Sequence, residues 1–279
     1  MTKITKCLFP VAGYGTRFLP ATKAIPKEML PILTKPLIQY GVEEAMSAGM
    51  VTMAMVTSKY KQAIKNHFEP HAAIEASIKG TVKSSLLDEV NHASEKCNFS
   101  YIEQDQMLGL GHAIYTGKPL IGDEPFAVIL PDDLCANSGD SVLTQMTKLY
   151  KQHPNCCIVA IEEVPMTQVD KYGVIDGELI EGSNNAYRVS SMVEKPSPID
   201  APTNLAIIGR YILTPEIFDI LENTKPDQNG EIQITDALMT LAKQGKVIAY
   251  KFQGERFDCG SVKGFVVATN AFAKSEGII

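Results

Sequence analysis

Hydrophobic residues in the first half of the chain alternate between short continuous runs and segments with helical spacing. Apolar runs typical of buried strands lie at residues 4–11, 51–57, 99–103, 126–130 and 156–164. Helical spacing lies between them, at residues 37–46, 60–68, 74–96 and 142–152, and Gly80 interrupts the longest of these segments. This alternation predicts an α/β fold in which a mixed, mostly parallel central sheet is flanked by helices.

The pattern changes after about residue 165. Strand candidates with short connections follow at residues 173–177, 187–193 and 205–213, and they predict a small antiparallel extension of the sheet. Helical patterns then lie at residues 215–221, 234–243 and 262–273. We expect one large domain over residues 1–260 and a C-terminal helix within residues 261–279.

Composition excludes several classes of protein. Hydrophobic residues make up 45% of the 279 residues, and the formal net charge of −6 argues against bulk binding to nucleic acid or an anionic membrane. The six cysteines form no C-x-x-C pair, which is typical of reduced thiols. No apolar run approaches the roughly 18 residues of a membrane span, and the N-terminus lacks a signal-peptide layout. We therefore expect a cytoplasmic protein.

Residues 11–31, directly after the first predicted strand, combine glycines, cations and prolines in one segment. Gly13 and Gly15 permit a tight turn and offer backbone amides at close approach to a ligand. Arg17 and Lys27 are two of three cations here, and three prolines oppose a regular helix. A stiff basic loop at the end of a strand favours a polyphosphate ligand, whereas the alternative is a loop whose charges are merely solvated.

Several better-known motifs do not fit. Phe18 stands where G-x-G-x-x-G requires its third glycine, which disfavours a nicotinamide-dependent dehydrogenase. The loop continues without Gly-Lys-Ser/Thr, so it is not a P-loop. The sequence contains no Asp-x-Asp, the metal motif usual in glycosyltransferases that consume nucleotide sugars. It also contains no G-x-S-x-G elbow for covalent catalysis.

Two acidic positions are candidate metal ligands. Asp132 and Asp133 directly follow the most apolar predicted strand, and ligands of open α/β sheets bind beyond the carboxyl ends of strands. A carboxylate there can share a Mg²⁺ ion with substrate phosphates, whereas the alternative is a pair that caps a turn. Asp258, in Phe257–Gly260, is by itself more typical of a turn residue than of a ligand.

Two further positions suit sugar and base contacts. Glu194 and Lys195 can serve one ligand only if the strand before Pro196 ends or bends there, and the alternative is a surface ion pair. Gln104, followed by the loop 109–112, carries a carboxamide that can both donate to and accept from the edge of a nucleobase. A plain loop explains this second spacing nearly as well.

Gly13–Arg17, continued through Pro26–Pro31, resembles the bacterial UTP–glucose-1-phosphate uridylyltransferases of the sugar-phosphate nucleotidyltransferase family. The likeness extends over nearly the whole chain and includes Gly109–Ala113, Val193–Pro196 and Asp258–Gly260. It implies a Rossmann-like nucleotidyltransferase fold. It divides the domain into a nucleotide-binding part, about residues 1–135, and a sugar-phosphate part, about residues 136–260, and it implies that the C-terminal helix contacts another subunit.

The resemblance also implies roles for individual residues. The implied catalytic residues are Arg17, Lys27, Asp132 and Lys195. The implied nucleotide contacts are Ala12, Gly13, Gly15, Glu28, Gln104, Gly109 and Asp133. The implied sugar-phosphate contacts are Gly173, Glu194 and Lys195, and the implied Mg²⁺ ligands are Asp132 and Asp258.

The activity implied is Mg²⁺-assisted transfer of uridylyl from UTP to glucose 1-phosphate, in line and without a covalent intermediate. The partners are the two substrates and further copies of the chain, as a dimer or tetramer. Thymidylyl transfer remains an alternative, because thymine and uracil differ by one methyl group. A second alternative is a weakly active regulatory protein that binds nucleotide.

Overall fold

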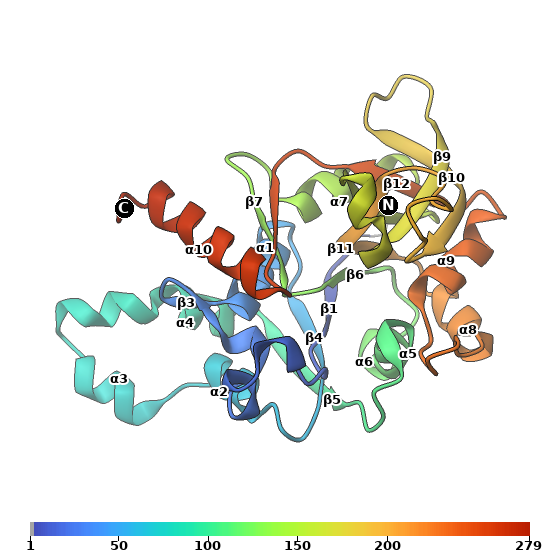
Figure 1. The fold of residues 1–279 in the computed structure, drawn as a ribbon. Coiled ribbons are helices and arrows are strands. Elements are labelled where there is room, and N and C mark those ends of the chain that lie inside the picture. Colours follow the sequence, from blue (N-terminus) through green and yellow to red (C-terminus); the bar gives the residue numbers. More distant parts are fainter. Residues whose placement is uncertain (1–2) are drawn as a thin grey trace.

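The computed structural model describes residues 3–279, and one nine-stranded sheet runs through them (Figure 1). The strand order is β5–β4–β1–β6–β11–β8–β12–β10–β9. The bounds are β1 Lys6–Pro10, β4 Thr52–Thr57, β5 Asn98–Glu103, β6 Phe126–Ile129, β8 Cys157–Glu163, β9 Gly173–Leu179, β10 Ala186–Glu194, β11 Leu205–Leu213 and β12 Val247–Lys251. Two small sheets pair β2 (Pro31–Ile32) with β3 (Lys35–Pro36), and β7 (Asp133–Ala136) with β13 (Glu255–Asp258).

The α/β class is confirmed, but the prediction of a mostly parallel sheet is wrong. Of the nine strand pairings in this main sheet, five are antiparallel and four are parallel. The difference comes from β11, which was expected in a small antiparallel extension but lies in the middle of the sheet, antiparallel to both β6 and β8. Its residues are buried from Ala206 to Leu213, as in a central strand covered on both faces.

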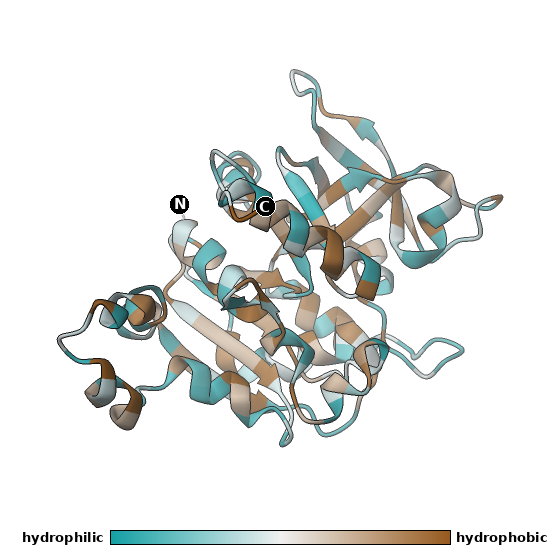
Figure 2. Ribbon diagram, turned by 60° about the vertical axis from the view of Figure 1, so that its left-hand side comes forward, coloured by the Kyte–Doolittle hydropathy of each residue, from teal (hydrophilic) through white to brown (hydrophobic). Residues whose placement is uncertain are grey.

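Helices cover both faces of the sheet. On one face lie α1 (Leu37–Ser47), α2 (Gln62–Phe68), α4 (Asp88–Lys96) and α7 (Val142–Gln152), and on the other lie α5 (Gly109–Thr116), α6 (Lys118–Ile121), α8 (Glu216–Asn223) and α9 (Ile234–Ala242). Alternate residues of β1 enter the two cores: Leu8 packs with the second helix set, and Cys7 and Phe9 pack with the first. Figure 2 shows hydrophobic residues gathered on the central strands and on the helix faces turned toward them.

The longest predicted helix, 74–96, is interrupted in the structure. It is divided into α3 (Ala72–Ile78), the 3₁₀ segment η4 (Val82–Leu87) and α4. Gly80 lies at φ 74°, in the left-handed region, and ends the helical run as its position indicated. The segment 109–112 is predicted to be a loop, but it forms the first turn of α5.

The C-terminal helix α10 (Val262–Ser275) was predicted and is confirmed. Ser261 caps it, because its Oγ accepts a hydrogen bond from the Gly264 amide at 3.1 Å. The helix packs on a separate apolar cluster that includes Ile32, Leu134 and Phe257. Within residues 3–279, no helix combines the length and the apolar character that crossing a membrane requires.

Candidate active site

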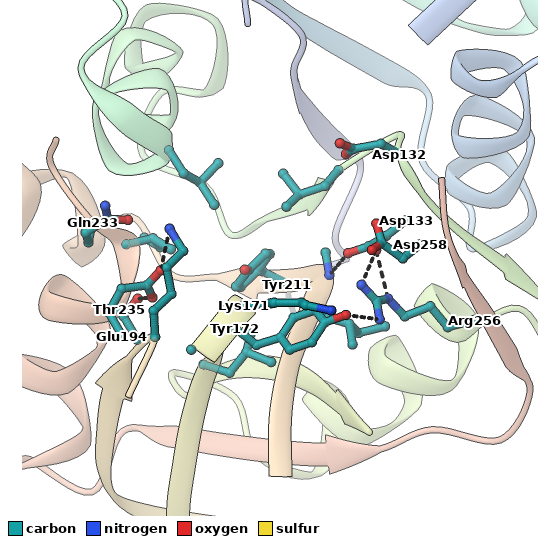
Figure 3. Close-up of a pocket in the computed structure, with 18 of the residues that line it drawn as sticks. Asp132, Asp133, Lys171, Tyr172, Glu194, Tyr211, Gln233, Thr235, Arg256 and Asp258 are labelled. Atoms are coloured by element: carbon teal, nitrogen blue, oxygen red, sulfur yellow. Dashed lines mark hydrogen bonds and ion pairs between the residues drawn. The ribbon is translucent and has the colours of Figure 1, made fainter. Parts of the chain in front are cut away.

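A cavity of about 630 Å³ lies beyond the carboxyl end of β6 (Figure 3). Asp132 and Asp133 line it from the segment that follows β6, and residues 207–209 line it from the facing part of β11. In Figure 3 these two aspartates and Asp258 lie toward one end, and Glu194 lies toward the other. This is the edge at which open α/β sheets bind ligands, as the sequence predicted.

At the acidic end, Lys27 and Asp132 form an ion pair. Lys27 Nζ lies 2.5 Å from Asp132 Oδ2, and both side chains are about one quarter exposed, at 24% and 23%. Burial favours the neutral amine, but the Asp132 and Glu28 carboxylates outweigh it and raise the pKa of Lys27. Burial likewise favours the neutral acid, but the Lys27 ammonium outweighs it and lowers the pKa of Asp132. Both groups are therefore ionised at neutral pH.

Asp132 and Asp258 flank the same small space. A Cβ placed on Gly260 would lie 3.1 Å from Asp132 Oδ2 and 3.1 Å from Asp258 Oδ1. Arg17 reaches this region too, because its guanidinium donates to the Gly260 carbonyl at 3.4 Å. Among residues 3–279 no group of three or more His, Cys, Asp or Glu side chains is placed to hold a metal. Two carboxylates fit Mg²⁺, which takes one or two from protein and the remaining oxygens from water and substrate.

Asp133 is buried, and both of its carboxylate oxygens have partners within the protein. Its Oδ2 accepts the Gly209 amide at 2.8 Å, and its Oδ1 lies 2.5 Å from the Arg256 guanidinium. Gly209 sits at an irregularity of β11, where the register with β8 shifts between Ile207 and Tyr211. Asp133 is therefore a bracing residue, by which we mean a residue that holds together the segments around the cavity.

Arg256 is a second bracing residue, and sequence reasoning missed it. Besides Asp133, it contacts Glu162 at 2.5 Å, and it lies over the Tyr172 ring at 5.0 Å from the centroid. Its side chain is 6% exposed. Because residues two apart on a strand face the same side, Arg256 and Asp258 share one face of β13. That spacing is a signal that could have revealed the pair.

At the other end of the cavity the strand ends and the chain bends, which meets the condition for Glu194 and Lys195 to serve one ligand. β10 ends at Glu194, and Lys195 has φ 46°, so both residues line the cavity. Thr235 donates a hydrogen bond to Glu194 Oε2, and Lys195 Nζ lies 3.4 Å from Glu194 Oε1. Gly173 lies opposite Glu194 in the β9–β10 pairing, and a Cβ there would come within 3.2 Å of Glu194 Oε2. The expected sugar-phosphate residues are thus brought together.

Apart from Asp133, the residues predicted to hold the nucleotide lie outside the lining of this cavity. Val11 and Gln104 donate backbone hydrogen bonds to Val56 and Thr57 at 2.8 Å each, so the segments after β1, β4 and β5 meet at one edge. Ala12 is buried, whereas a Cβ on Gly13 would meet no atom within 4 Å.

Three other predicted nucleotide residues have definite local roles. Gly15 (φ 66°) and Gly109 (φ 90°) occupy the left-handed backbone region that suits glycine. The Gln104 carboxamide lies 2.8 Å from His112 Nδ1. Burial lowers the pKa of His112, so its neutral ring can accept that hydrogen bond.

Glu28, also assigned to the nucleotide from sequence, is 1% exposed and pairs with Lys61. Lys61 Nζ lies 2.6 Å from Glu28 Oε2, and Lys61 is itself 6% exposed. Sequence reasoning did not single out Lys61, because one lysine in a Ser-Lys-Tyr-Lys segment is typical of a solvated loop.

Comparison with known proteins agrees with the geometry. A nucleotidyl transferase family model matches residues 10–275. A UTP–glucose-1-phosphate uridylyltransferase of Pseudomonas aeruginosa is 59% identical over 268 residues, 96% of this chain and 95% of that protein. The enzyme of that name from Staphylococcus epidermidis is 46% identical over 276 residues, 99% of this chain and 94% of that protein.

Solved structures extend the likeness to the fold. An apo UDP-glucose pyrophosphorylase superposes with a TM-score of 0.94 at 59% identity, covering 98% of this chain and 99% of that one. A UDP-glucose pyrophosphorylase complexed with UDP-glucose gives 0.90 at 57% identity, with the same coverage of 98% and 99%. A UTP-bound enzyme from Acinetobacter baumannii gives 0.88 at 38% identity, covering 97% and 93%. The chain belongs to the UTP–glucose-1-phosphate uridylyltransferases of the nucleotidyl transferase family.

Proposed function

We propose that this chain joins UTP and glucose 1-phosphate into UDP-glucose and pyrophosphate at the cavity beyond β6. The observation that carries the proposal is the arrangement of Lys27, Asp132 and Arg17 at one end and Lys195 and Glu194 at the other. Cations at both ends suit two phosphate-bearing substrates that must meet between them. The structures named above, one with UTP bound and one with UDP-glucose bound, support UTP as a substrate and UDP-glucose as the product.

In the reaction, a phosphate oxygen of glucose 1-phosphate attacks the α-phosphorus of UTP in line. A new P–O bond forms as the bond from that phosphorus to the bridging oxygen of pyrophosphate breaks, and pyrophosphate leaves with the electron pair. The attacking phosphate is already ionised at neutral pH, so the protein need supply neither a nucleophile nor a strong base. Its task is to orient two anions and to lower their repulsion.

The repulsion between the two anionic substrates determines how much stabilisation the site must provide. Two like unit charges about 4 Å apart cost about 4 kcal/mol at an effective dielectric near 20. Arg17 and Lys27 face the triphosphate, and Lys195 faces the sugar phosphate. Asp132 and Asp258 would hold Mg²⁺, which when bound neutralises phosphate charge and polarises the reacting phosphoryl group.

The two substrates occupy different parts of the chain. The uracil and ribose lie against Ala12, Gly13, Gly15, Gln104 and Gly109, in the part formed by residues up to about 135. Glu194 and the Gly173 backbone receive the glucose hydroxyls, in the part formed by residues 136–260. The short gap between Glu194 and Gly173 supports this, since a side chain at 173 would displace the carboxylate.

The enzyme acts in the cytoplasm as a homo-oligomer, with α10 as a subunit contact. Support for the contact comes from the exposed valines of α10, which are Val262, Val266 and Val267. Support for the location comes from six free cysteines, none paired in the structure of residues 3–279.

The test is pyrophosphate release measured across UTP, dTTP, ATP and GTP, each with several sugar 1-phosphates and Mg²⁺. We expect signal with UTP and glucose 1-phosphate. A clear preference for dTTP would contradict the uridylyl assignment while leaving the chemistry intact. Absence of release with every pair would support a regulatory nucleotide-binding protein instead.

A further inference from the structure

A buried ion pair lies behind the phosphate-facing loop, and the reaction described above does not use it. Lys61 and Glu28 are separated by 33 positions in sequence, yet their charged groups meet at 2.6 Å. Lys61 directly precedes α2, whereas Glu28 is the central residue of the 3₁₀ turn η3 (Lys27–Met29). The pair therefore ties the turn that carries Lys27 to the helix that follows β4.

Lys27 and Glu28 are neighbours on that turn, and their side chains point in different directions from it. A 3₁₀ helix has three residues per turn, so adjacent side chains diverge by about 120°. Lys27 reaches the Asp132 carboxylate at the cavity, while Glu28 reaches Lys61 in the interior. Any rotation of the turn that releases Glu28 would also swing Lys27 away from Asp132.

Stability alone does not account for this pair. Removing two charges from water carries a desolvation penalty that often equals or exceeds their attraction, and apolar residues of similar size commonly do as well. In addition, Glu28 Oε1 is buried without a hydrogen-bond partner among the described residues. Unlike an apolar contact, an ion pair fixes direction, because the ammonium donates a hydrogen bond to the carboxylate only in a narrow range of positions.

We propose that Lys61 is a positioning residue for uridylyl transfer: through Glu28 it fixes the turn that aims Lys27 at Asp132 and at the triphosphate. The inference rests on the proposed function, in which Lys27 faces the phosphates of UTP. Lys61 itself touches neither substrate.

The first test is Lys61→Met, which keeps the length of the side chain and removes the charge. Misplacement of a phosphate-facing group by about 1 Å can cost up to about 100-fold, so we expect kcat/KM for UTP to fall roughly 10- to 100-fold. The KM for glucose 1-phosphate should stay within about twofold, because Lys195 is held by a different strand. Lys61→Arg, which keeps the charge, should recover part of the loss.

The matched control is Lys6→Met. Lys6 is also partly buried and lies 3.3 Å from Glu124, but it begins β1, at the opposite end of that strand from the loop. Lys6→Met should lower the free energy of unfolding without changing kcat/KM. The double variant Glu28→Leu with Lys61→Met removes both charges; it should fold about as stably as the parent and still react slowly.

A double-mutant cycle with Lys27→Ala decides the mechanism. If Lys61 acts through Lys27, adding Lys61→Met to Lys27→Ala should cause little further loss. Additive losses, or a normal kcat/KM in the Glu28→Leu, Lys61→Met variant, would overturn the inference. A normal kcat/KM in Lys27→Ala alone would instead contradict the proposed function of the loop, so the two failures are distinguishable.

Discussion

The Lys27 ammonium rests on the Asp132 carboxylate at 2.5 Å, although 105 positions separate the two residues in sequence. One is the proposed cation for the triphosphate and the other is the proposed ligand for Mg²⁺. Each therefore neutralises its partner in the protein alone. On substrate binding, the phosphates and the metal would take over these two roles, and the charge balance of the site would be preserved.

Replacing Asp132 by Asn should abolish most Mg²⁺-dependent turnover. The amide keeps the shape of the side chain but carries no charge for a hard cation, and losses on the order of 10²- to 10³-fold are the usual scale for such a contact. The measurement is pyrophosphate release over a Mg²⁺ titration. Asp140→Asn is the control, because Asp140 pairs with Lys148 away from the cavity. Near-normal turnover by Asp132→Asn at ordinary Mg²⁺ would refute the metal assignment.

The same pair predicts a dependence of stability on pH. The pKa of Asp132 is lower in the folded protein than its ordinary value of 3.8, so its ionised form stabilises the fold above that value. This contribution is lost as the pH falls through the folded pKa. Urea unfolding of the parent and of Asp132→Asn, compared from about pH 5 down to about pH 2.5, should show a shallower decline for the variant. Parallel declines would show that Asp132 does not contribute.

Replacing Lys195 by Ala should weaken the use of glucose 1-phosphate far more than the use of UTP. We expect kcat/KM for the sugar phosphate to fall about 10²-fold, while the KM for UTP changes by less than about threefold. Initial rates with each substrate varied in turn provide the measurement. Lys225→Ala removes an exposed lysine outside the cavity lining and should leave both constants unchanged. An equal effect on both substrates would contradict the assignment of Lys195 to the sugar end.

Two glycine substitutions should separate ligand binding from folding. At Gly13 an added methyl group meets no protein atom within 4 Å, so Gly13→Ala should fold normally and raise the KM for UTP by filling ligand space. At Gly209 the same methyl group would lie 2.6 Å from Leu130 Cβ, so Gly209→Ala should lower the melting temperature. Thermal unfolding and UTP kinetics on both variants test this contrast. Normal UTP kinetics for Gly13→Ala would place the nucleotide elsewhere.

Sequence reasoning succeeded where one local pattern decides the outcome. The predicted helix 142–152 and the predicted strand 205–213 match α7 and β11 residue for residue, because periodicity and length left little choice. The antiparallel direction of β11 was predicted, but its place in the middle of the sheet, between β6 and β8, was beyond reach, because strand order depends on pairing between distant segments. That place is set by pairing with β6, about 80 residues earlier in the chain.

The residues of the candidate site also differ in whether a local pattern or a distant partner decides their position. The bend at Lys195 could be predicted because Pro196 marks it locally. Lys61 could not, because its partner Glu28 lies 33 positions away in sequence. For Arg256 the local signal was its spacing from Asp258, but its partner Asp133, 123 positions away, could not be predicted. A charged residue in a strand or loop reads as solvated until the fold supplies a buried carboxylate beside it.

Asp132 and Asp133 are chemically identical neighbours, yet Asp133 is needed mainly for folding and Asp132 mainly for turnover. Asp133 holds the Gly209 amide and Arg256, so loss of its carboxylate would leave the buried Gly209 amide unpaired and the Arg256 guanidinium with Glu162 as its remaining carboxylate partner. In a library randomised at both positions, failures at 133 should therefore register as scarce protein. Failures at 132 should appear mainly as folded protein that forms no product. Selection for the amount of folded protein would thus act mainly on position 133, and selection for turnover mainly on position 132.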